Sequence, residues 1–408
     1  FDMDMCKTYF SALNLMLRNI LKKTGLSIQS QETLNTPEGG DLKGDGLVDR
    51  ITESEAVFRF SVRQDATNDN YFVVDFGGGS TDIFISLINV GYSRDYSSTS
   101  LKFGARKILI EKLLHNDAVL LKQLMNKFAD KFQELNIFDP TKYIQGFADR
   151  NKSSMVEDLF SIRIRQNPND VAADLQPSTF GEAFMRACAE EREERLVLEL
   201  KKRIAFYLGA AIWLSGVMLR NSNTVGVLIS LLFTGNGSKM IHWLTPETDR
   251  IRHYIYLLIN DSGKMFMPRE NFSIRFSTMP KEEVAFGSLL DLPNGFFDPD
   301  QQAPKQVAFD QIHSSRDDLD AYSAVRYEHS NIKTERDDFA EYITAYRKAC
   351  VNSFEWSFEE NEYDPSILDS VGFRSSIKTT KEKDGYFLSA LEEISARYMP
   401  TDTSHESN

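Results

Sequence analysis

The sequence predicts an α/β fold, because strand-forming and helix-forming segments are mixed along it. Tyr71 to Asp75 and Ile83 to Val90 are rich in β-branched and aromatic residues, and the glycine triplet between them indicates a hairpin. Residues 104–135 and 181–220 carry apolar side chains at helical spacing. Val225 to Phe233 is a continuous apolar run of strand length. Strands combined with long helices in this way are typical of α/β proteins.

Length and composition indicate a globular protein and exclude several classes. At about 150 residues per domain, the 408 residues correspond to two or three domains. The net charge of −13 argues against nucleic-acid binding, because phosphate recognition requires a basic surface. Cys6, Cys188 and Cys350 lie far apart with no CxxC pair, which excludes a disulfide framework and a zinc ribbon. The cysteine usage fits a reducing compartment, so we expect a cytoplasmic protein.

The longest apolar run, Ala205 to Leu219, is shorter than the ~18 residues that a membrane span requires. Basic residues at 201–203 and at Arg220 flank it within a longer helical pattern, so we expect a buried helix and no membrane span. The mixed-charge stretch from Glu190 to Arg203 is expected to form a solvated helix face. The chain opens on Phe1 with no signal-peptide pattern, and we expect it to begin partway through a longer gene product.

The first 50 residues predict a helix followed by a loop. Residues 4–23 show the apolar spacing of an amphipathic helix. Ser30 to Arg50 is rich in Gly, Asp, Thr and Pro, a composition that favours a surface loop.

The most informative segment is the string from Asp75 to Asp82, Asp-Phe-Gly-Gly-Gly-Ser-Thr-Asp, at the bend of the expected hairpin. Consecutive glycines let the backbone approach a phosphate closely and point its N–H groups at the oxygens. The hydroxyl groups of Ser80 and Thr81 can add donors, and an aspartate at a strand end offers the hard oxygen that Mg²⁺ prefers. A hairpin turn alone would require neither flanking aspartate. We therefore predict a phosphate site here, with Asp75 and Asp82 as candidate metal ligands.

Three further segments accompany this string in a fixed order. Thr52-Glu53-Ser54-Glu55-Ala56 lies just before the first strand of the hairpin. Phe233-Thr234-Gly235-Asn236-Gly237-Ser238-Lys239 follows the buried strand, where a backbone turn can pass under an adenine. Pro280-Lys281-Glu282-Glu283-Val284-Ala285-Phe286-Gly287 opens a helix of small residues.

With these segments, residues 50–290 resemble the ATPase superfamily of actin, DnaK-type heat-shock chaperones and sugar kinases. The string at 75–82 is similar to the family's second phosphate loop, whose first aspartate holds the Mg²⁺ shell. Glu53 occupies the place of the chaperone glutamate that orients the attacking water. Gly235 to Lys239 matches the adenosine loop, with Asn236 in place of a glycine. Glu283 to Gly287 resembles the hinge helix that follows it.

The resemblance implies an actin-like ATPase domain of ribonuclease-H-like fold that binds ATP and Mg²⁺. It implies catalytic roles for Glu53 and Asp75 and metal contact for Asp75 and Asp82. It assigns the phosphates to Gly77, Gly78, Gly79, Ser80, Thr81 and Gly104, and the nucleoside to Gly235, Asn236, Gly237, Ser238 and Lys239.

The sequence also departs from the family. The first phosphate loop, Asp-x-Gly-Thr/Ser, and the lysine that accompanies it match nothing in residues 1–50 or 291–408. We therefore expect residues 1–65 to be a partial first domain and 66–290 to be the second ATPase domain, with a helical insertion at about 105–220. Chaperones continue with a β-rich peptide-binding domain, whereas residues 291–408 here form an acidic segment rich in aromatic residues.

The C-terminal segment predicts a helical extension. It holds 24 acidic and 12 basic residues, which is most of the net negative charge. Thr334 and Asp337 begin a capped amphipathic helix with Phe339, Tyr342 and Tyr346 on one face. We expect this extension to pack back on the body of the protein, and the alternative is an arm that binds a partner.

The leading functional hypothesis is an ATP-dependent switch, in which Mg·ATP binding or hydrolysis closes two domains and controls a protein partner. The alternatives are a bacterial-actin-like filament and a nucleotide-dependent scaffold without hydrolysis. A sugar kinase fits least, because no sugar-binding acid stands apart from the nucleotide loops. This chain alone is expected to be a poor ATPase, since one phosphate loop cannot clamp the γ-phosphate from both sides.

Overall fold

The computed structural model describes residues 33–35, 41–43, 53–64, 70–88, 94–101, 103–109, 113, 119–130, 158–160, 180–220, 228–265, 267–278, 280–288, 305–306, 332–366 and 386–397. The chain divides into two compact units, Phe1–Thr52 and Glu53–Asn408. In the first unit, β1 (Thr33–Asn35) pairs antiparallel with β2 (Asp41–Lys43), so the expected loop contains two short strands. The helix expected at 4–23 lies outside the described residues.

The second unit is built on a mixed sheet with the strand order β7-β6-β3-β4-β5-β8. The hairpin predicted around the glycine triplet is confirmed, because β3 and β4 pair antiparallel. β4 is also antiparallel to β5, whereas the β3–β6, β6–β7 and β5–β8 pairs are parallel. The strands are β3 (Asn70–Phe76), β4 (Thr81–Ile88), β5 (Arg94–Leu101), β6 (Ile229–Thr234), β7 (Phe272–Phe276) and β8 (Lys305–Gln306).

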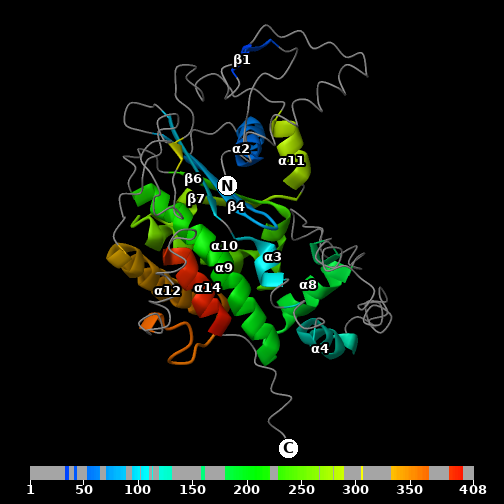
Figure 1. Ribbon diagram of the computed structural model, residues 1–408. Coiled ribbons are helices and arrows are strands. Elements are labelled where there is room, and N and C mark those ends of the chain that lie inside the picture. The colour runs from blue at the N-terminus through cyan, green and yellow to red at the C-terminus, as the bar shows by residue number, and fades with distance from the viewer. Residues whose placement is uncertain are drawn as a thin grey trace, which may run out of the picture. The chain divides into compact units, whose positions relative to one another are not determined.

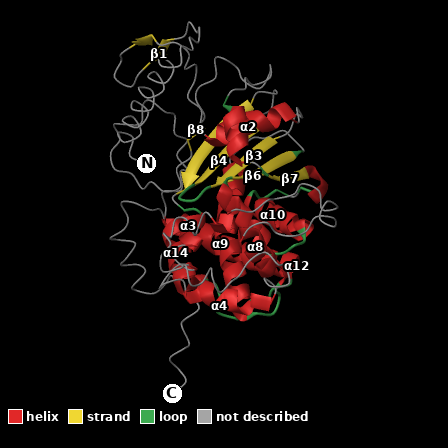
Figure 2. Cartoon of the chain, turned by 90° about the vertical axis from the view of Figure 1, so that its right-hand side faces the viewer, coloured by secondary structure: helices red, strands yellow, loops and turns green. Residues whose placement is uncertain are grey.

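Helices cover both faces of this sheet, so the predicted α/β class is confirmed (Figures 1 and 2). α2 and α11 lie on one face, and α9, α10, α12 and α14 form the layer on the other. The described elements between β5 and β6 are all helical, as expected for an insertion there. The α-helices are α2 (Glu53–Gln64), α3 (Ala105–Ile108), α4 (Val119–Lys127), α8 (Phe180–Glu190), α9 (Arg195–Arg220), α10 (Thr248–Ser262), α11 (Pro280–Gly287), α12 (Ile332–Phe354) and α14 (Tyr386–Arg397), and the 3-10 helices are η4 (Asn236–Trp243) and η5 (Arg269–Asn271).

Side chains alternate along β3, and this alternation separates two cores. Tyr71 and Val73 point to the α2 face, where they pack with Val57 and Phe58 of α2. Their neighbours in β3, Val74 among them, belong to the larger core on the α9 face. α2 is thus part of the second unit, which begins at Glu53, whereas the expected domain boundary lay at residue 65.

α9 is the central helix of the larger core and is buried along most of its length. It is the one described helix long and apolar enough to cross a membrane, and its apolar window is wholly buried within the fold. The predicted helical stretch 181–220 is interrupted at 191–194. There the Glu191 carboxylate accepts hydrogen bonds from backbone N–H groups of the next three residues, and the carboxylate of Glu194 caps α9 through the Val197 N–H.

The expected solvated face at 190–203 is wrong for its last three residues, which are buried. Lys201 donates to the Ala189 carbonyl at 3.1 Å, and Arg203 donates to the Ser395 carbonyl at 3.1 Å. Lys202 lies 2.7 Å from the carboxylate of Glu362. The C-terminal extension covers this part of α9, which sequence spacing within one helix does not reveal.

The C-terminal extension packs on α9 and α10, as the sequence predicts. Tyr346 of α12 donates its hydroxyl to the Lys202 carbonyl at 2.7 Å, and Tyr342 donates to the Phe206 carbonyl. Phe387 of α14 lies edge-on to Phe339 of α12, with ring centroids 5.0 Å apart. Aromatic side chains therefore attach this segment to the body of the second unit.

Candidate functional site

Two aspartates lie opposite each other where β3 ends and β4 begins. Asp75 lies near the end of β3 and pairs directly across the ladder with Asp82 of β4. Directly opposed residues place their side chains on the same face, with Cβ atoms about 4.5–5.5 Å apart. Because Tyr71 and Val73 point to the α2 face, Asp75 and Asp82 do so too. The hairpin thus brings together the two carboxylates that flank the glycine string.

Asp75 is only 7% exposed, and its environment disfavours a negative charge. Burial raises the pKa of its carboxyl to about 7, and the charges of Asp82 and Glu53 add to the rise, while Lys281 opposes it. Burial also raises the pKa of Asp82, against hydrogen bonds from Ser100 and Ser80 that lower it. A cation bound here would stabilise the ionised form of both groups.

The glycine turn points two of its backbone N–H groups away from α3. The Gly77 N–H closes the turn on the Ser80 carbonyl at 2.9 Å. The N–H groups of Ala105 and Arg106, at the start of α3, donate to the carbonyls of Gly77 and Gly78 at 3.0 and 2.8 Å. In a trans peptide the N–H points opposite to the C=O, so the N–H groups of Gly78 and Gly79 point away from α3. This is the orientation an anion site requires.

Three glycines from other segments pack closely on this turn. A Cβ on Gly104 would lie 2.7 Å from the Gly77 carbonyl oxygen. A Cβ on Gly237 would lie 2.5 Å from the Phe76 carbonyl oxygen, and one on Gly235 would overlap the Asp75 carboxylate. Only glycine permits these approaches, so the sequence segments at 75–79, 104 and 235–237 form one continuous site.

The turn after β6 is held by its own hydrogen bonds. Gly235 has a φ of +82°, and Ser238 donates its hydroxyl to the Gly235 carbonyl at 2.7 Å. Asn236 is exposed at the start of η4. Lys239 is half-buried, 3.4 Å from the Phe160 carbonyl oxygen, and burial lowers the pKa of its ammonium. Ser238 therefore supports the turn, whereas Asn236 is open to solvent and Lys239 extends to Phe160.

The two hydroxyl groups of the string behave differently. Ser80 donates to the Asp82 carboxylate at 3.3 Å and lies beside the metal candidates. Thr81 is fully buried and donates to the Phe103 carbonyl at 2.7 Å. The structure therefore brings Ser80 to the site and places the Thr81 hydroxyl in the fold behind it.

Glu53 reaches the site from the first residue of α2. It forms an ion pair with Lys281 of α11, with Nζ and Oε2 3.2 Å apart. The two helices cross where Gly287 faces the Ala56 backbone so closely that a Cβ on Gly287 would overlap it. The glycine at the end of the predicted hinge helix thus allows α11 to carry Lys281 to Glu53.

Lys281 and Glu283 were not among the predicted site residues, although Glu283 begins the segment that resembles the hinge helix. The Glu283 carboxyl lies under α11 beside the hydroxyls of Thr234 and Ser277, and burial raises its pKa. Thr234 is the register partner of Asp75, so this buried group adjoins the site. Both residues lie in the segment 280–287 that the sequence analysis noted. Their neighbours belong to α2, to the end of β6 and to the residues after β7, so only the fold brings them together.

The donor set fits a hydrated magnesium ion. The described residues hold no group of three or more His, Cys, Asp or Glu side chains arranged around a metal. Asp75 and Asp82 offer two adjacent carboxylates, and Mg²⁺ characteristically keeps several waters and takes one or two carboxylates together with substrate phosphates. These residues therefore fit an ion that arrives with a phosphate ligand.

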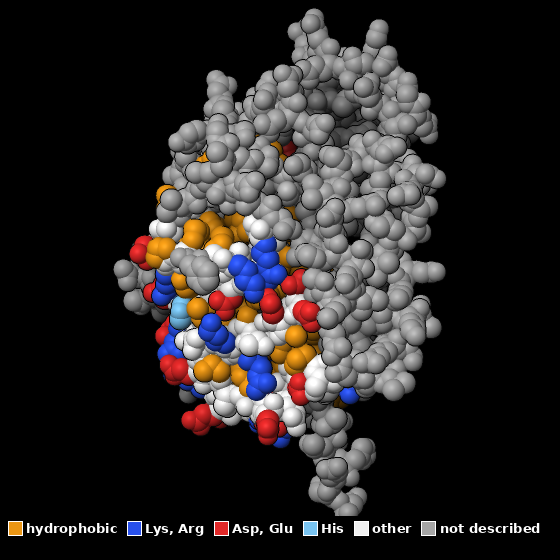
Figure 3. All heavy atoms as spheres, turned by 90° about the vertical axis from the view of Figure 1, so that its left-hand side faces the viewer, with side chains coloured by type: hydrophobic (Ala, Val, Ile, Leu, Met, Phe, Trp, Pro, Cys, Tyr) orange, Lys and Arg blue, Asp and Glu red, His pale blue; other side chains and the backbone are white. Residues whose placement is uncertain are grey.

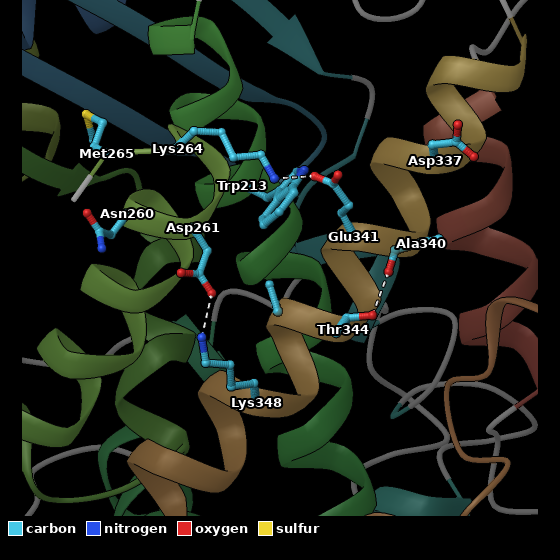
Figure 4. Close-up of a pocket in the computed structure, with 11 residues that line it drawn as sticks. Trp213, Asn260, Asp261, Lys264, Met265, Asp337, Ala340, Glu341, Thr344 and Lys348 are labelled. Atoms are coloured by element: carbon cyan, nitrogen blue, oxygen red, sulfur yellow. Dashed lines mark hydrogen bonds and ion pairs between the residues drawn. The ribbon is translucent and has the colours of Figure 1, made fainter.

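A groove of about 560 Å³ lies elsewhere, between α9, α10 and α12 (Figure 4). Ion pairs at its sides join Lys264 to Glu341 at 2.6 Å and Lys348 to Asp261 at 3.2 Å, with Trp213 between the helices. Basic and acidic side chains are also interspersed on the described surface seen in Figure 3. The groove shares no residue with the glycine turns and is separate from the candidate site.

Comparisons with known proteins do not assign the chain to a family. A scan of protein-family models finds no match, and no curated protein matches the chain significantly.

Proposed function

We propose that the second unit binds Mg·ATP at the carboxyl ends of the inner strands β3 and β6. The observation that carries the proposal is the close packing of Gly104, Gly235 and Gly237 on the glycine turn beside Asp75. A simple hairpin turn would not require three glycines from two distant segments. A phosphate loop that must approach a ligand through its backbone does require such space.

The sheet supports an actin-like, ribonuclease-H-like fold for this unit. β3, β4 and β5 form an antiparallel meander, and β6 and β7 extend the sheet from β3 in parallel. In an open sheet of this kind, ligands bind beyond the carboxyl ends of the parallel strands, where the chain crosses over. Asp75 and Gly235 lie at those ends. The strand order is therefore compatible with the fold that the motifs imply.

Each group has a defined role in this proposal. The N–H groups of Gly78 and Gly79, with the hydroxyl of Ser80, would bind phosphate oxygens. Asp75 and Asp82 would hold hydrated Mg²⁺, which supplies positive charge against the phosphates. The turn at 235–237 would lie along the nucleoside, and Glu53 would accept a hydrogen bond from the attacking water. Nucleotide-dependent closure would then control a partner protein, and we place this activity in the cytoplasm.

Calorimetry of the full chain with Mg·ATP tests the proposal. Wild-type protein should bind, and Gly78→Val should lose binding while its thermal unfolding remains cooperative, because its Cβ would lie 3.3 Å from Arg106 Nε and the larger side chain would shift the turn that presents the N–H groups. Mg·GTP should bind more weakly if the turn at 235–237 contacts adenine. Absence of Mg·ATP binding by the wild type, or unchanged binding by Gly78→Val, would refute the site.

A further inference from the structure

Lys281 brings a positive charge to the acidic side chains of the candidate site. Asp75 and Asp82 lie opposite each other in the hairpin, and the Lys281 ammonium lies 3.2 Å from the Glu53 carboxylate at the start of α2. The helix that carries Lys281 lies over the same strands as Asp75, because Val284 of α11 packs against the cluster that holds Val73 of β3 and Leu232 of β6. A nucleoside triphosphate entering this site would add more negative charge beside the carboxylates, so a further positive charge besides Mg²⁺ would stabilise it.

The ion pair is built so that it can open. The side chains of Lys281 and Glu53 are 67% and 60% exposed, so both charges are already hydrated and separating them costs little. A lysine carries its charge on a flexible stem, whereas α11 itself is held by the crossing of Gly287 on Ala56. The ammonium can therefore move while the helix stays in place.

We propose that Lys281 leaves Glu53 and binds a nucleotide phosphate when Mg·ATP enters the site. In the unliganded protein Lys281 pairs with Glu53 and holds its carboxylate. In the liganded protein the same ammonium neutralises phosphate charge, and the released Glu53 carboxylate can position water. Lys281 would thus supply, from α11 of the second unit, a positive charge on the nucleotide. This inference rests on the proposed function and adds a residue that selects for phosphate.

The test measures Mg·ATP and adenosine affinities of the full chain by calorimetry. Lys281→Met should weaken Mg·ATP binding about tenfold, as expected for loss of one charge-assisted contact, and leave adenosine binding unchanged. Lys281→Arg should keep most of the affinity because it keeps the charge. Lys348→Met is the matched control, since Lys348 forms a surface ion pair of the same 3.2 Å length with Asp261 on other helices.

Glu53→Gln separates a ligand role from a structural one. If Lys281 must leave Glu53 to bind phosphate, Glu53→Gln should bind Mg·ATP at least as tightly as the wild type, opposite in direction to Lys281→Met. A merely structural ion pair would make both variants weaker alike, and that result would overturn the inference. Wild-type affinity in Lys281→Met, together with lost binding in Gly78→Val, would overturn the inference and leave the proposed function standing. Absence of Mg·ATP binding by the wild type would refute both.

Discussion

Replacing Gly235 by alanine should destabilise the second unit and disturb the Asp75 carboxylate. Gly235 has φ +82° and ψ 147°, a combination that side-chain-bearing residues rarely adopt and that costs about 1–3 kcal/mol. The new Cβ would also lie 2.6 Å from the Phe76 carbonyl oxygen and closer still to Asp75. Relieving such a buried overlap costs about 1–3 kcal/mol more. We therefore expect a loss of about 2–6 kcal/mol in the free energy of unfolding.

Gly79→Ala provides the matched control within the same site. A Cβ on Gly79 would have no atom within 4 Å, so the substitution should change stability by less than about 1 kcal/mol. Urea denaturation of both variants, followed by tryptophan fluorescence, measures the difference. Equal stability of Gly235→Ala and Gly79→Ala would refute the close approach of the turn after β6 to the end of β3.

Three other outcomes are expected. Because burial raises the pKa of Asp75 to about 7, the stability that this carboxyl contributes should be present at pH 4 and be lost as the pH rises through 7; Asp75→Asn should remove this contribution in denaturation measured across that range, and a profile identical to that of the wild type would contradict it. Lys202→Met should cost about 1–3 kcal/mol in chemical denaturation by leaving the half-buried Glu362 carboxylate without its partner, and adding Glu362→Leu should recover part of the loss; an unchanged stability would show that the pair is solvated. The 408-residue chain should release phosphate from ATP at no more than background rate, since it offers one phosphate loop, and steady turnover that Asp75→Ala abolishes would contradict that expectation.

Local patterns in the sequence predicted much of the sheet and several helices. The β-branched and aromatic residues predicted β3 and β4, and the glycine triplet predicted the turn between them. The apolar run before Thr234 predicted β6. These signals are readable because strand pairing across a short turn involves residues close in the chain. The amphipathic spacing after Thr334 likewise predicted α12 and its buried face.

Other features depended on partners far away in the chain. The sequence predicted a solvated face at 201–203, because helix spacing alone cannot show that Lys202 pairs with Glu362 and that Arg203 donates to the Ser395 carbonyl. From the sequence, Ser80 and Thr81 were both predicted to donate to phosphate. In the structure Ser80 donates to Asp82, whereas Thr81 points to the opposite face of the sheet and donates to the Phe103 carbonyl. A side chain's environment is set by what packs against it.

The sequence by itself determined the local features on which the predicted phosphate site depends, which are three consecutive glycines between two aspartates at a hairpin bend. Those properties are local, since they depend on missing Cβ atoms and on two strands joined by one turn. Only the tertiary structure decided that Gly104 and Gly235 pack against that bend, and that α11 brings Lys281 to Glu53. Residues so distant in the chain meet because the sheet places β6 beside β3 and because Gly287 lets two helices cross closely, and neither contact leaves a periodic trace in the sequence.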